Sequence, residues 1–343
     1  MAEPLLTVDG LEVAFATDKG LARVLDKVNF SIDAGEIVGL VGESGCGKTT
    51  LARSILGILP ANSARILNGS IRFEGRDLLT VNEADLASNF RGRVVTFVPQ
   101  DPFSSFNPVF TIGSQIMELM KWKSPDAGKP GVFGRYNRQR READYQRIIQ
   151  LMQTVQLPDA EGILRKYPHE VSGGQRQRLM IAMALLPEPR LIIADEPTTA
   201  LDVTIQAQIL KLLRQLAQER EVAVLFTTHD LGSAYEICDR ITVMYAGQEV
   251  ESAAAERFFA KPHHPYTRRL LQSLPSQSGN IQGIPGQIPG LVKPPRGCRF
   301  HPRCPLAKPA CSADRPEVFW PAEGHMLRCF NPETTAIAGK GGQ

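Results

Sequence analysis

The first part of the chain alternates apolar and polar residues in short runs. The segments LLTVDGLEVAF and VLDKVNFSI, within residues 5–35, show this alternation and are bounded by Gly or Asp. A period of two places successive side chains on opposite faces of a strand, so these runs predict antiparallel strands. Another strand-like segment, GSIRFEGRDL, follows at residues 69–78. The pattern therefore predicts an antiparallel β region near the amino terminus.

Continuous apolar runs predict a second kind of strand. The segment EIVGLVGESGCGKTTLARSILGIL (36–59) runs from an apolar strand through a Gly-rich turn into a helix. The runs RLIIADE (190–196) and VAVLFTTHD (222–230) are apolar and β-branched, which is typical of parallel strands covered on both faces. Residues 101–185 read mainly as helix and loop. We therefore expect an α/β core with a helical insert.

Composition narrows the class of protein. The chain has 343 residues, 43% of them hydrophobic, and a formal charge of +3, so it can bury a large core and lacks the basic balance of a dedicated nucleic-acid binder. Its start lacks the long apolar stretch of a signal peptide, and the run LMIAMALL (179–186) is too short to span a membrane. We expect a cytoplasmic chain whose six cysteines are not disulfides, which makes the clustered cysteines candidate metal ligands.

The segment GESGCGKT (42–49) fits the phosphate-loop pattern of Gly, four residues and Gly-Lys-Thr. Its glycines let backbone N–H groups approach phosphates, Lys48 is suited to the β and γ oxygens, and Thr49 to magnesium. A glycine-rich turn with no ligand is the alternative, against which the complete strand, loop and helix context argues. The expected nucleotide-binding residues here are Gly42, Glu43, Ser44, Gly45, Cys46, Gly47, Lys48, Thr49 and Thr50.

An acidic pair, Asp195 and Glu196, follows the apolar run LIIA. Asp195 is suited to hold magnesium, through a water molecule, and Glu196 to polarise an attacking water. Alone, such a pair could equally be solvated carboxylates at the end of a strand. The phosphate loop upstream favours the catalytic interpretation.

The segment VSGGQ (171–175) leads into the helical run RQRLMIAMALL and offers a second anion-binding turn. Here the chain resembles the ATP-binding cassette (ABC) family, whose signature loop has this sequence apart from the more usual leading Leu. The resemblance covers about residues 5–255. It implies an α/β fold with a phosphate-loop NTPase (RecA-like) core, an antiparallel β subdomain and a helical signature subdomain at about 101–185. It also implies head-to-tail pairing, with each ATP between one phosphate loop and the other chain's signature.

The resemblance assigns roles to residues that carry no signal alone. Phe15 matches the aromatic that stacks on adenine, Gln100 the magnesium-sensing glutamine, and His229 the switch histidine. Read alone, Phe15 would be core, and His229 a core or surface residue. Asp202, in ALD (200–202), matches the dimer-facing loop. The implied catalytic residues are Lys48, Gln100, Glu196 and His229; the other nucleotide contacts are Phe15, Ser172, Gly173, Gly174, Gln175 and Asp202; the magnesium ligands are Thr49, Gln100 and Asp195.

The kind of cassette follows from what surrounds it. No membrane domain is fused, as in many exporters, and no second cassette is present, as in the translation factors. The segment between Lys48 and Ser172 is too short for the long coiled coil of chromosome-maintenance ATPases. Among the classes of the family, a separate importer subunit is therefore expected. The segments HHPYTRRLL (263–271) and IPGLVKPPRGCRFHPRCP resemble the extension of the dipeptide and oligopeptide permease ATPases. The resemblance implies ATP-driven peptide import at the cytoplasmic face of the inner membrane. The alternatives are a soluble nucleic-acid maintenance ATPase, or an importer of nickel or antimicrobial peptides.

The same resemblance implies the partners. They are a second ABC ATPase, making a heterodimer, two transmembrane permease subunits and an extracytoplasmic peptide-binding protein; no nucleic-acid partner is expected. The basic stretch RYNRQRREADYQR (135–147) is either a solvated helix face or a contact with anionic lipid or a permease loop. Cys238 is most simply a core residue.

From about residue 275 the periodicity fades and Pro and Gly accumulate, which predicts a small irregular module within a carboxy-terminal extension at 256–343. Cys298, Cys304, Cys311 and Cys329 are separated by five, six and seventeen residues. Structural zinc sites usually show ligand pairs two to four residues apart, whereas the resembling permease ATPases carry a four-cysteine iron–sulfur cluster. We expect a [4Fe–4S] cluster with a structural role outside hydrolysis; Zn²⁺ and four unliganded thiols are the alternatives.

Overall fold

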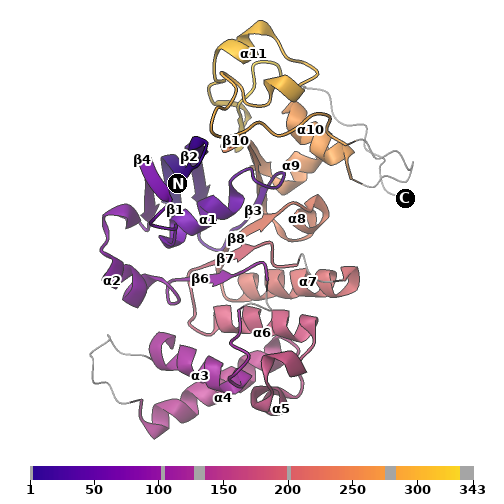
Figure 1. The fold of residues 1–343 in the computed structure, drawn as a ribbon. Helices are drawn as coiled ribbons and strands as arrows, with labels where there is room; N and C mark the ends of the chain where they lie inside the picture. Colours follow the sequence, from indigo (N-terminus) through magenta and orange to yellow (C-terminus); the bar gives the residue numbers. More distant parts are fainter. Residues whose placement is uncertain (1–2, 102–104, 127–135, 199–201, 275–282, 333–343) are drawn as a thin grey trace, which may run out of the picture. The chain divides into compact units, whose positions relative to one another are not determined.

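A computed structural model describes residues 3–101, 105–126, 136–198, 202–274 and 283–332. The chain forms two compact units: residues 1–79 with 226–343, and residues 80–225. The chain passes from the second unit back into the first within strand β8 (Ala223–Thr228). Figure 1 traces the elements of each unit along the chain.

The antiparallel sheet predicted near the amino terminus is confirmed in the first unit. Its strands lie in the order β2-β1-β4-β5, and β1 pairs antiparallel with both β2 and β4. The inward side chains of β1, such as Leu6, Val8 and Val13, are buried, as the alternation predicts. The bounds are β1 Leu6–Thr17, β2 Gly20–Ile32, β4 Ala64–Phe73 and β5 Arg76–Asp77.

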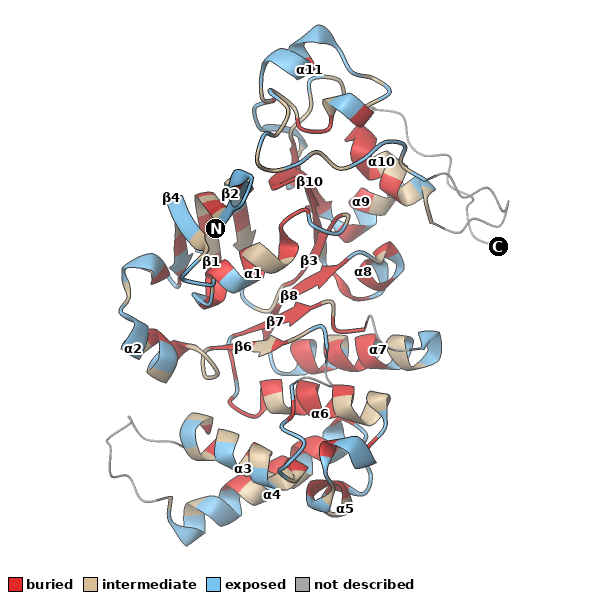
Figure 2. Ribbon diagram, in the orientation of Figure 1, coloured by how far each residue is buried: buried red, intermediate tan, exposed pale blue. Residues whose placement is uncertain are grey.

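The first unit also holds part of a second, mixed sheet. Strand β3 pairs parallel with β9, and β10 pairs antiparallel with β9 on one side and with β12 on the other. Every residue of β3 is buried, as Figure 2 shows in red. The strands are β3 Ile37–Val41, β9 Arg240–Tyr245, β10 Gln248–Ala254, β11 Phe319–Ala322 and β12 His325–Leu327. The carboxy-terminal segment of residues 283–332, called the module below, therefore adds strands β11 and β12 to the sheet that carries the phosphate loop.

Short helices complete the first unit. Helix α1 follows the phosphate loop, and α10 begins within the HHPYTRRLL segment. The helices are α1 Lys48–Leu56, η1 Leu78–Thr80, α8 Leu231–Ile237, α9 Ala255–Ala260, α10 Pro265–Gln272, η4 His301–Arg303 and α11 Pro309–Ala313.

The second unit is mainly helical, as the sequence predicts. Its strands β6 (Val95–Val98) and β7 (Leu191–Asp195) pair in parallel. The helices are α2 Glu83–Asp85, η2 Leu86–Phe90, α3 Ile112–Lys123, α4 Arg138–Thr154, α5 Ala160–Arg165, η3 Pro168–Glu170, α6 Gly173–Leu185 and α7 Val203–Glu219. No helix in the described ranges is long and apolar enough to cross a membrane.

Part of the basic stretch is internal to the second unit. Asp144 on α4 is fully buried and accepts a 2.7 Å hydrogen bond from the hydroxyl of Ser124. The guanidinium groups of Arg140 and Arg147 each lie 3.7 Å from the carboxylate of Asp144. These two arginines therefore neutralise a buried carboxylate, which neither interpretation of the stretch anticipated.

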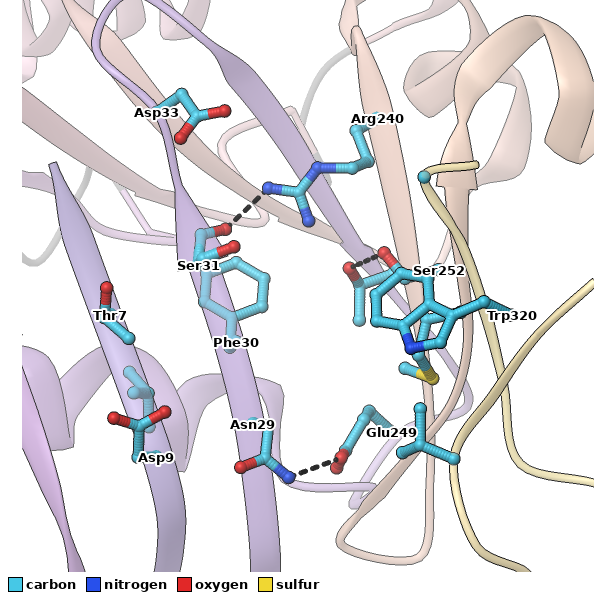
Figure 3. Close-up of a pocket in the computed structure, with 15 residues that line it drawn as sticks. Thr7, Asp9, Asn29, Phe30, Ser31, Asp33, Arg240, Glu249, Ser252 and Trp320 are labelled. Atoms are coloured by element: carbon cyan, nitrogen blue, oxygen red, sulfur yellow. Dashed lines mark hydrogen bonds between the residues drawn. The ribbon is translucent and has the colours of Figure 1, made fainter. Parts of the chain in front are cut away.

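A cavity of about 490 Å³ lies in the first unit between the antiparallel sheet and the strands of the module. Polar side chains of its lining pair with one another, as Figure 3 shows: Asn29 donates to Glu249 at 3.3 Å, and the hydroxyls of Thr242 and Ser252 are 2.8 Å apart. Trp320 of β11 lies on the module side of this cavity. The hydrogen bonds in this lining therefore join β10 to β2 and to β9, while the module contributes the side chains of Val318, Trp320 and Met326 to the cavity.

Candidate functional site

The phosphate loop leaves the end of β3 and enters α1 at Lys48. Gly42, Gly45 and Gly47 have φ values of +155°, +79° and +113°, in the region that favours glycine. A Cβ at Gly42 would lie 2.3 Å from the carbonyl oxygen of Met244, so no other residue fits there. The Lys48 ammonium donates to the Gly42 carbonyl at 2.8 Å. The loop therefore forms a concave backbone with a cation at its base, as phosphate binding requires.

The other residues of this loop differ in accessibility. Cys46 is buried, and burial raises the pKa of its thiol although the charge of Lys48 opposes the shift. Its side chain is therefore a core group, and only its backbone is suited to face a phosphate. Ser44 is exposed, and Thr49 and Thr50, at the start of α1, are half-buried.

The acidic pair lies at the end of β7 in the second unit. Asp195 is the last residue of the strand and is buried, and Glu196 follows it with a φ of +48°. The side-chain amide of Gln100 donates to the Glu196 carboxylate at 3.3 Å. The structure thus brings the expected magnesium-sensing glutamine and the expected base into contact.

The signature turn forms the amino end of α6 in the same unit. The Ser172 hydroxyl accepts from the Gln175 N–H at 3.2 Å, and the Gln175 side chain accepts from the Ser172 N–H at 3.0 Å. This capping box orders the turn and leaves the hydroxyl proton of Ser172 able to donate to an anion. Asp202 caps α7 by accepting from the Ile205 N–H at 2.9 Å, while its neighbours Ala200 and Leu201 lie outside the described residues.

Two residues assigned by resemblance lie in the first unit, with the phosphate loop. Phe15 on β1 is half-buried between its strand partners Ala22 and Ala64. His229 is exposed and directly follows β8. Neither residue is a fully buried core side chain, so both are accessible for the roles that the resemblance implies.

The four clustered cysteines, Cys298, Cys304, Cys311 and Cys329, line one small cavity. Burial, reinforced by the neighbouring thiols, raises the pKa of Cys298 to about 11 and that of Cys329 to about 12. A cationic metal centre would favour the thiolate forms, so the donor chemistry of these four thiols suits a metal. Yet no group of three or more His, Cys, Asp or Glu in the described ranges is arranged to hold a metal ion.

The sequence analysis missed the residues that hold the phosphate loop from outside. The Tyr266 hydroxyl accepts from the Glu43 N–H at 3.0 Å, and Arg303 pairs with the Glu43 carboxylate at 2.8 Å. The resemblance covers their segments, HHPYTRRLL and CRFHPRCP, but assigns no role to Tyr266 or Arg303. Their aromatic and basic character was visible, but nothing in the sequence pattern pointed to the loop.

Comparison with known proteins now identifies the cassette. Residues 25–199 match the ABC transporter family, and residues 250–311 match the family described as the oligopeptide/dipeptide transporter, C-terminal region. The chain belongs to the ABC transporter family. ATP hydrolysis coupled to transport is the activity expected of this ABC ATPase.

Three peptide-transport relatives are similar to this chain over nearly its whole length. It is 44% identical to the probable peptide ABC transporter ATP-binding protein y4tR of Sinorhizobium fredii, over 96% of this chain and 95% of the relative. It is 44% identical to the oligopeptide transport ATP-binding protein AppD of Bacillus subtilis, over 95% and 96%. It is 41% identical to the dipeptide transport ATP-binding protein DppD of Escherichia coli, over 96% and 97%.

Solved structures confirm the predicted fold. The dimeric structure of MJ0796, a bacterial ABC transporter cassette, matches with a TM-score of 0.61 at 24% identity, covering 73% of this chain and 98% of that one. The cassette cbiO1 of Clostridium perfringens, part of the transporter complex cbiONQ, matches with a TM-score of 0.60 at 23% identity, over 75% and 91%. The expected α/β phosphate-loop core is therefore correct.

Proposed function

We propose that this ABC ATPase drives the import of dipeptides or oligopeptides. The observation that carries the proposal is that similarity to peptide-transport ATPases extends through both the cassette and the carboxy-terminal extension. We further propose that it works at the cytoplasmic face of the inner membrane with two permease subunits, a second ATPase subunit and an extracytoplasmic peptide-binding protein. Nickel or antimicrobial peptides are the alternative cargo.

Phosphate binding is assigned to the loop at residues 42–50. The Lys48 ammonium and the loop N–H groups neutralise the β and γ phosphates, and Phe15 stacks on the adenine. Thr49, Gln100 and Asp195 are the residues that would hold magnesium, which supplies positive charge to the phosphates when it is bound.

Hydrolysis is assigned to Glu196. Its carboxylate accepts a proton from water as the water oxygen bonds to the γ phosphorus and the bond to the β–γ bridging oxygen breaks, which yields ADP and phosphate. The 3.3 Å hydrogen bond from Gln100 orients this carboxylate and links its position to the following loop. His229 is the proposed γ-phosphate sensor.

We also propose that the signature turn serves the nucleotide of a paired ATPase. Ser172, Gly173, Gly174 and Gln175 form a capped helix start, which suits it to a phosphate supplied by another chain. Hydrolysis then requires the two chains to close on each other, so ATP binding drives closure and hydrolysis resets it.

Transport by the reconstituted complex tests the cargo. The ATPase is assembled with its permeases and binding protein in vesicles, and the uptake of labelled dipeptides, longer peptides, nickel and antimicrobial peptides is measured. We expect ATP-dependent uptake of dipeptides or oligopeptides alone. Uptake restricted to nickel or antimicrobial peptides would replace the proposed cargo. ATPase activity that needs nucleic acid and no permease would support the maintenance-ATPase alternative.

We propose that the four thiols of the small cavity hold an iron–sulfur cluster, with zinc as the alternative. Such a cluster supplies four metal–thiolate bonds to a module that has little apolar core. Anaerobically purified protein should be brown and contain about four irons per chain, and Cys329→Ser should lose both properties. Cys238→Ser, which alters a buried cysteine elsewhere, should retain them. Colourless protein with one zinc per chain would contradict the iron–sulfur assignment.

A further inference from the structure

The segment between Cys298 and Cys304 contacts the phosphate loop directly. Two nitrogens of the Arg303 guanidinium donate to the two oxygens of the Glu43 carboxylate, at 2.8 Å and 3.1 Å. Glu43 is the second residue of the phosphate loop. The Arg303 side chain is 4% exposed and that of Glu43 is 26% exposed, so solvent screens this two-point ion pair only partly.

Arg303 is fixed on its other side by the module. It donates to the carbonyl oxygens of Ile284 and Pro285 at 3.1 Å and 2.9 Å, and to the Tyr245 hydroxyl at 3.3 Å. The guanidinium is therefore anchored on both sides, by the Glu43 carboxylate and by these three oxygens.

An aromatic cluster holds the backbone at the same place. The Tyr266 hydroxyl accepts from the Glu43 N–H at 3.0 Å, and the Tyr266 ring lies against Tyr245 and Phe300 with centroid separations of 4.6 Å and 5.3 Å. Phe300 is fully buried and belongs to the same segment as Arg303. Both the side chain and the backbone of Glu43 are thus held by this aromatic and arginine cluster.

A second arginine of the segment anchors it to the core. Arg299 pairs with Asp26 at 2.9 Å and donates to the carbonyl oxygen of Ala246. The next residue, Gly247, donates its N–H to the Cys46 carbonyl of the phosphate loop at 2.8 Å. The segment is therefore linked to the loop at two points, Glu43 directly and Cys46 through the β9–β10 turn.

We propose that Arg303 is a positioning residue for ATP binding, which clamps Glu43 and cancels its charge. Without Arg303, an uncompensated carboxylate would remain on the loop that must bind a polyanion, and Glu43 would keep only its backbone hydrogen bond to Tyr266. The proposal rests on ATP binding by the cassette and does not depend on what the four thiols hold. It gives the extension a part in ATP binding, while the expectation that the cluster has no part in hydrolysis stays a prediction.

The test compares MgATP affinity among full-length variants. Arg303→Gln should weaken binding about tenfold, or about 1.4 kcal/mol, measured as the Kd of a fluorescent ATP analogue. In the assembled transporter, KM for ATP should rise similarly while kcat at saturating ATP changes less than about twofold, because Arg303 does not touch the reacting atoms. Adding Glu43→Gln to Arg303→Gln should restore the Kd to within about threefold, since no unpaired charge then remains.

A matched control separates positioning from general stability. Arg328 also links the module to the core through a largely buried ion pair, 2.7 Å from Glu249 on β10, outside the phosphate loop. Arg328→Gln should leave the Kd for MgATP unchanged within about twofold, even if it lowers the Tm. If Arg303→Gln fails to fold, the same Kd measurement is made on the double variant and on Arg303→Lys. The lysine keeps the positive charge but cannot make the two-point contact with the Glu43 carboxylate.

Three outcomes would overturn the proposal. They are an unchanged Kd in Arg303→Gln, an equal loss of affinity in Arg328→Gln, and a double variant that binds no better than Arg303→Gln. Failure of the unsubstituted chain to bind MgATP would instead contradict the ATPase assignment, so the two failures are distinguishable.

Discussion

The phosphate loop and the cysteine-rich module belong to the same compact unit but are ordered in different ways. The loop depends on neighbours in sequence: a buried strand, glycines with positive φ and a helix that begins at Lys48. The module depends on distant partners, as when Arg303 reaches Glu43, 260 positions earlier. A local motif is readable from sequence, whereas a segment held by scattered polar contacts is not.

Burial shows the same difference. Every residue of β3 is buried, whereas most of α11 is exposed, as Figure 2 shows in pale blue. The module joins the core through polar contacts, including the 2.8 Å hydrogen bond between the fully buried side chains of His325 and Glu251. Because a small apolar core contributes little stability, these contacts and any metal centre must hold the module in place.

The largest effect is expected from replacing Glu196, because the substitution removes the proposed catalytic base. Glu196→Gln should retain ATP binding but slow turnover at least about 100-fold, or about 2.7 kcal/mol, because the amide cannot accept the proton of water. The measurement is phosphate release by the assembled transporter. Glu188→Gln is the control: Glu188 also has positive φ but lies 3.8 Å from Arg147, and its loss should leave turnover unchanged. Unchanged turnover in Glu196→Gln would exclude Glu196 as the base.

Two glycine substitutions compare how far the stability of the protein depends on the phosphate loop and on the segment around Gly290. At Gly42, an added Cβ would lie 2.3 Å from the Met244 carbonyl oxygen, and φ is +155°. Gly42→Ala should therefore lower the free energy of unfolding by about 2.5 kcal/mol. At Gly290, nothing lies within 4 Å of an added Cβ. Gly290→Ala should therefore change the free energy of unfolding by less than about 0.5 kcal/mol. Chemical denaturation measures both, and equal effects would remove the distinction between the two regions.

The sequence predicted the features that depend on local patterns. The phosphate loop, the acidic pair at the end of β7 and the turn before α6 all lie in the predicted strand, loop or helix contexts. The contact between Gln100 and Glu196 is compatible with the resemblance, although the two residues are 96 positions apart. The clamp on Glu43 and the buried Asp144 within a basic helix were not predictable, because neither periodicity nor spacing reports which distant side chains meet in the interior.

The smallest effect is expected at the junction between the core and the module. His264 is fully buried, caps α10 and accepts from the Tyr266 N–H at 3.1 Å. Burial lowers its pKa to about 4, although the nearby charge of Glu251 opposes the shift. Below about pH 6.5 the unfolded histidine binds a proton that the folded one does not, so its contribution to stability is full above that pH and declines as pH falls.

Replacing this histidine should flatten the pH dependence of stability. The loss is about 1.4 kcal/mol per pH unit, or about 2 kcal/mol between pH 6.5 and pH 5. His264→Asn keeps a capping side chain but cannot titrate, so its free energy of unfolding should fall by about 2 kcal/mol less over the same interval. Urea denaturation at the two pH values measures the difference. An identical decline in both proteins would mean that another group, such as His263, whose pKa is also lowered by burial, causes the acid sensitivity of the junction.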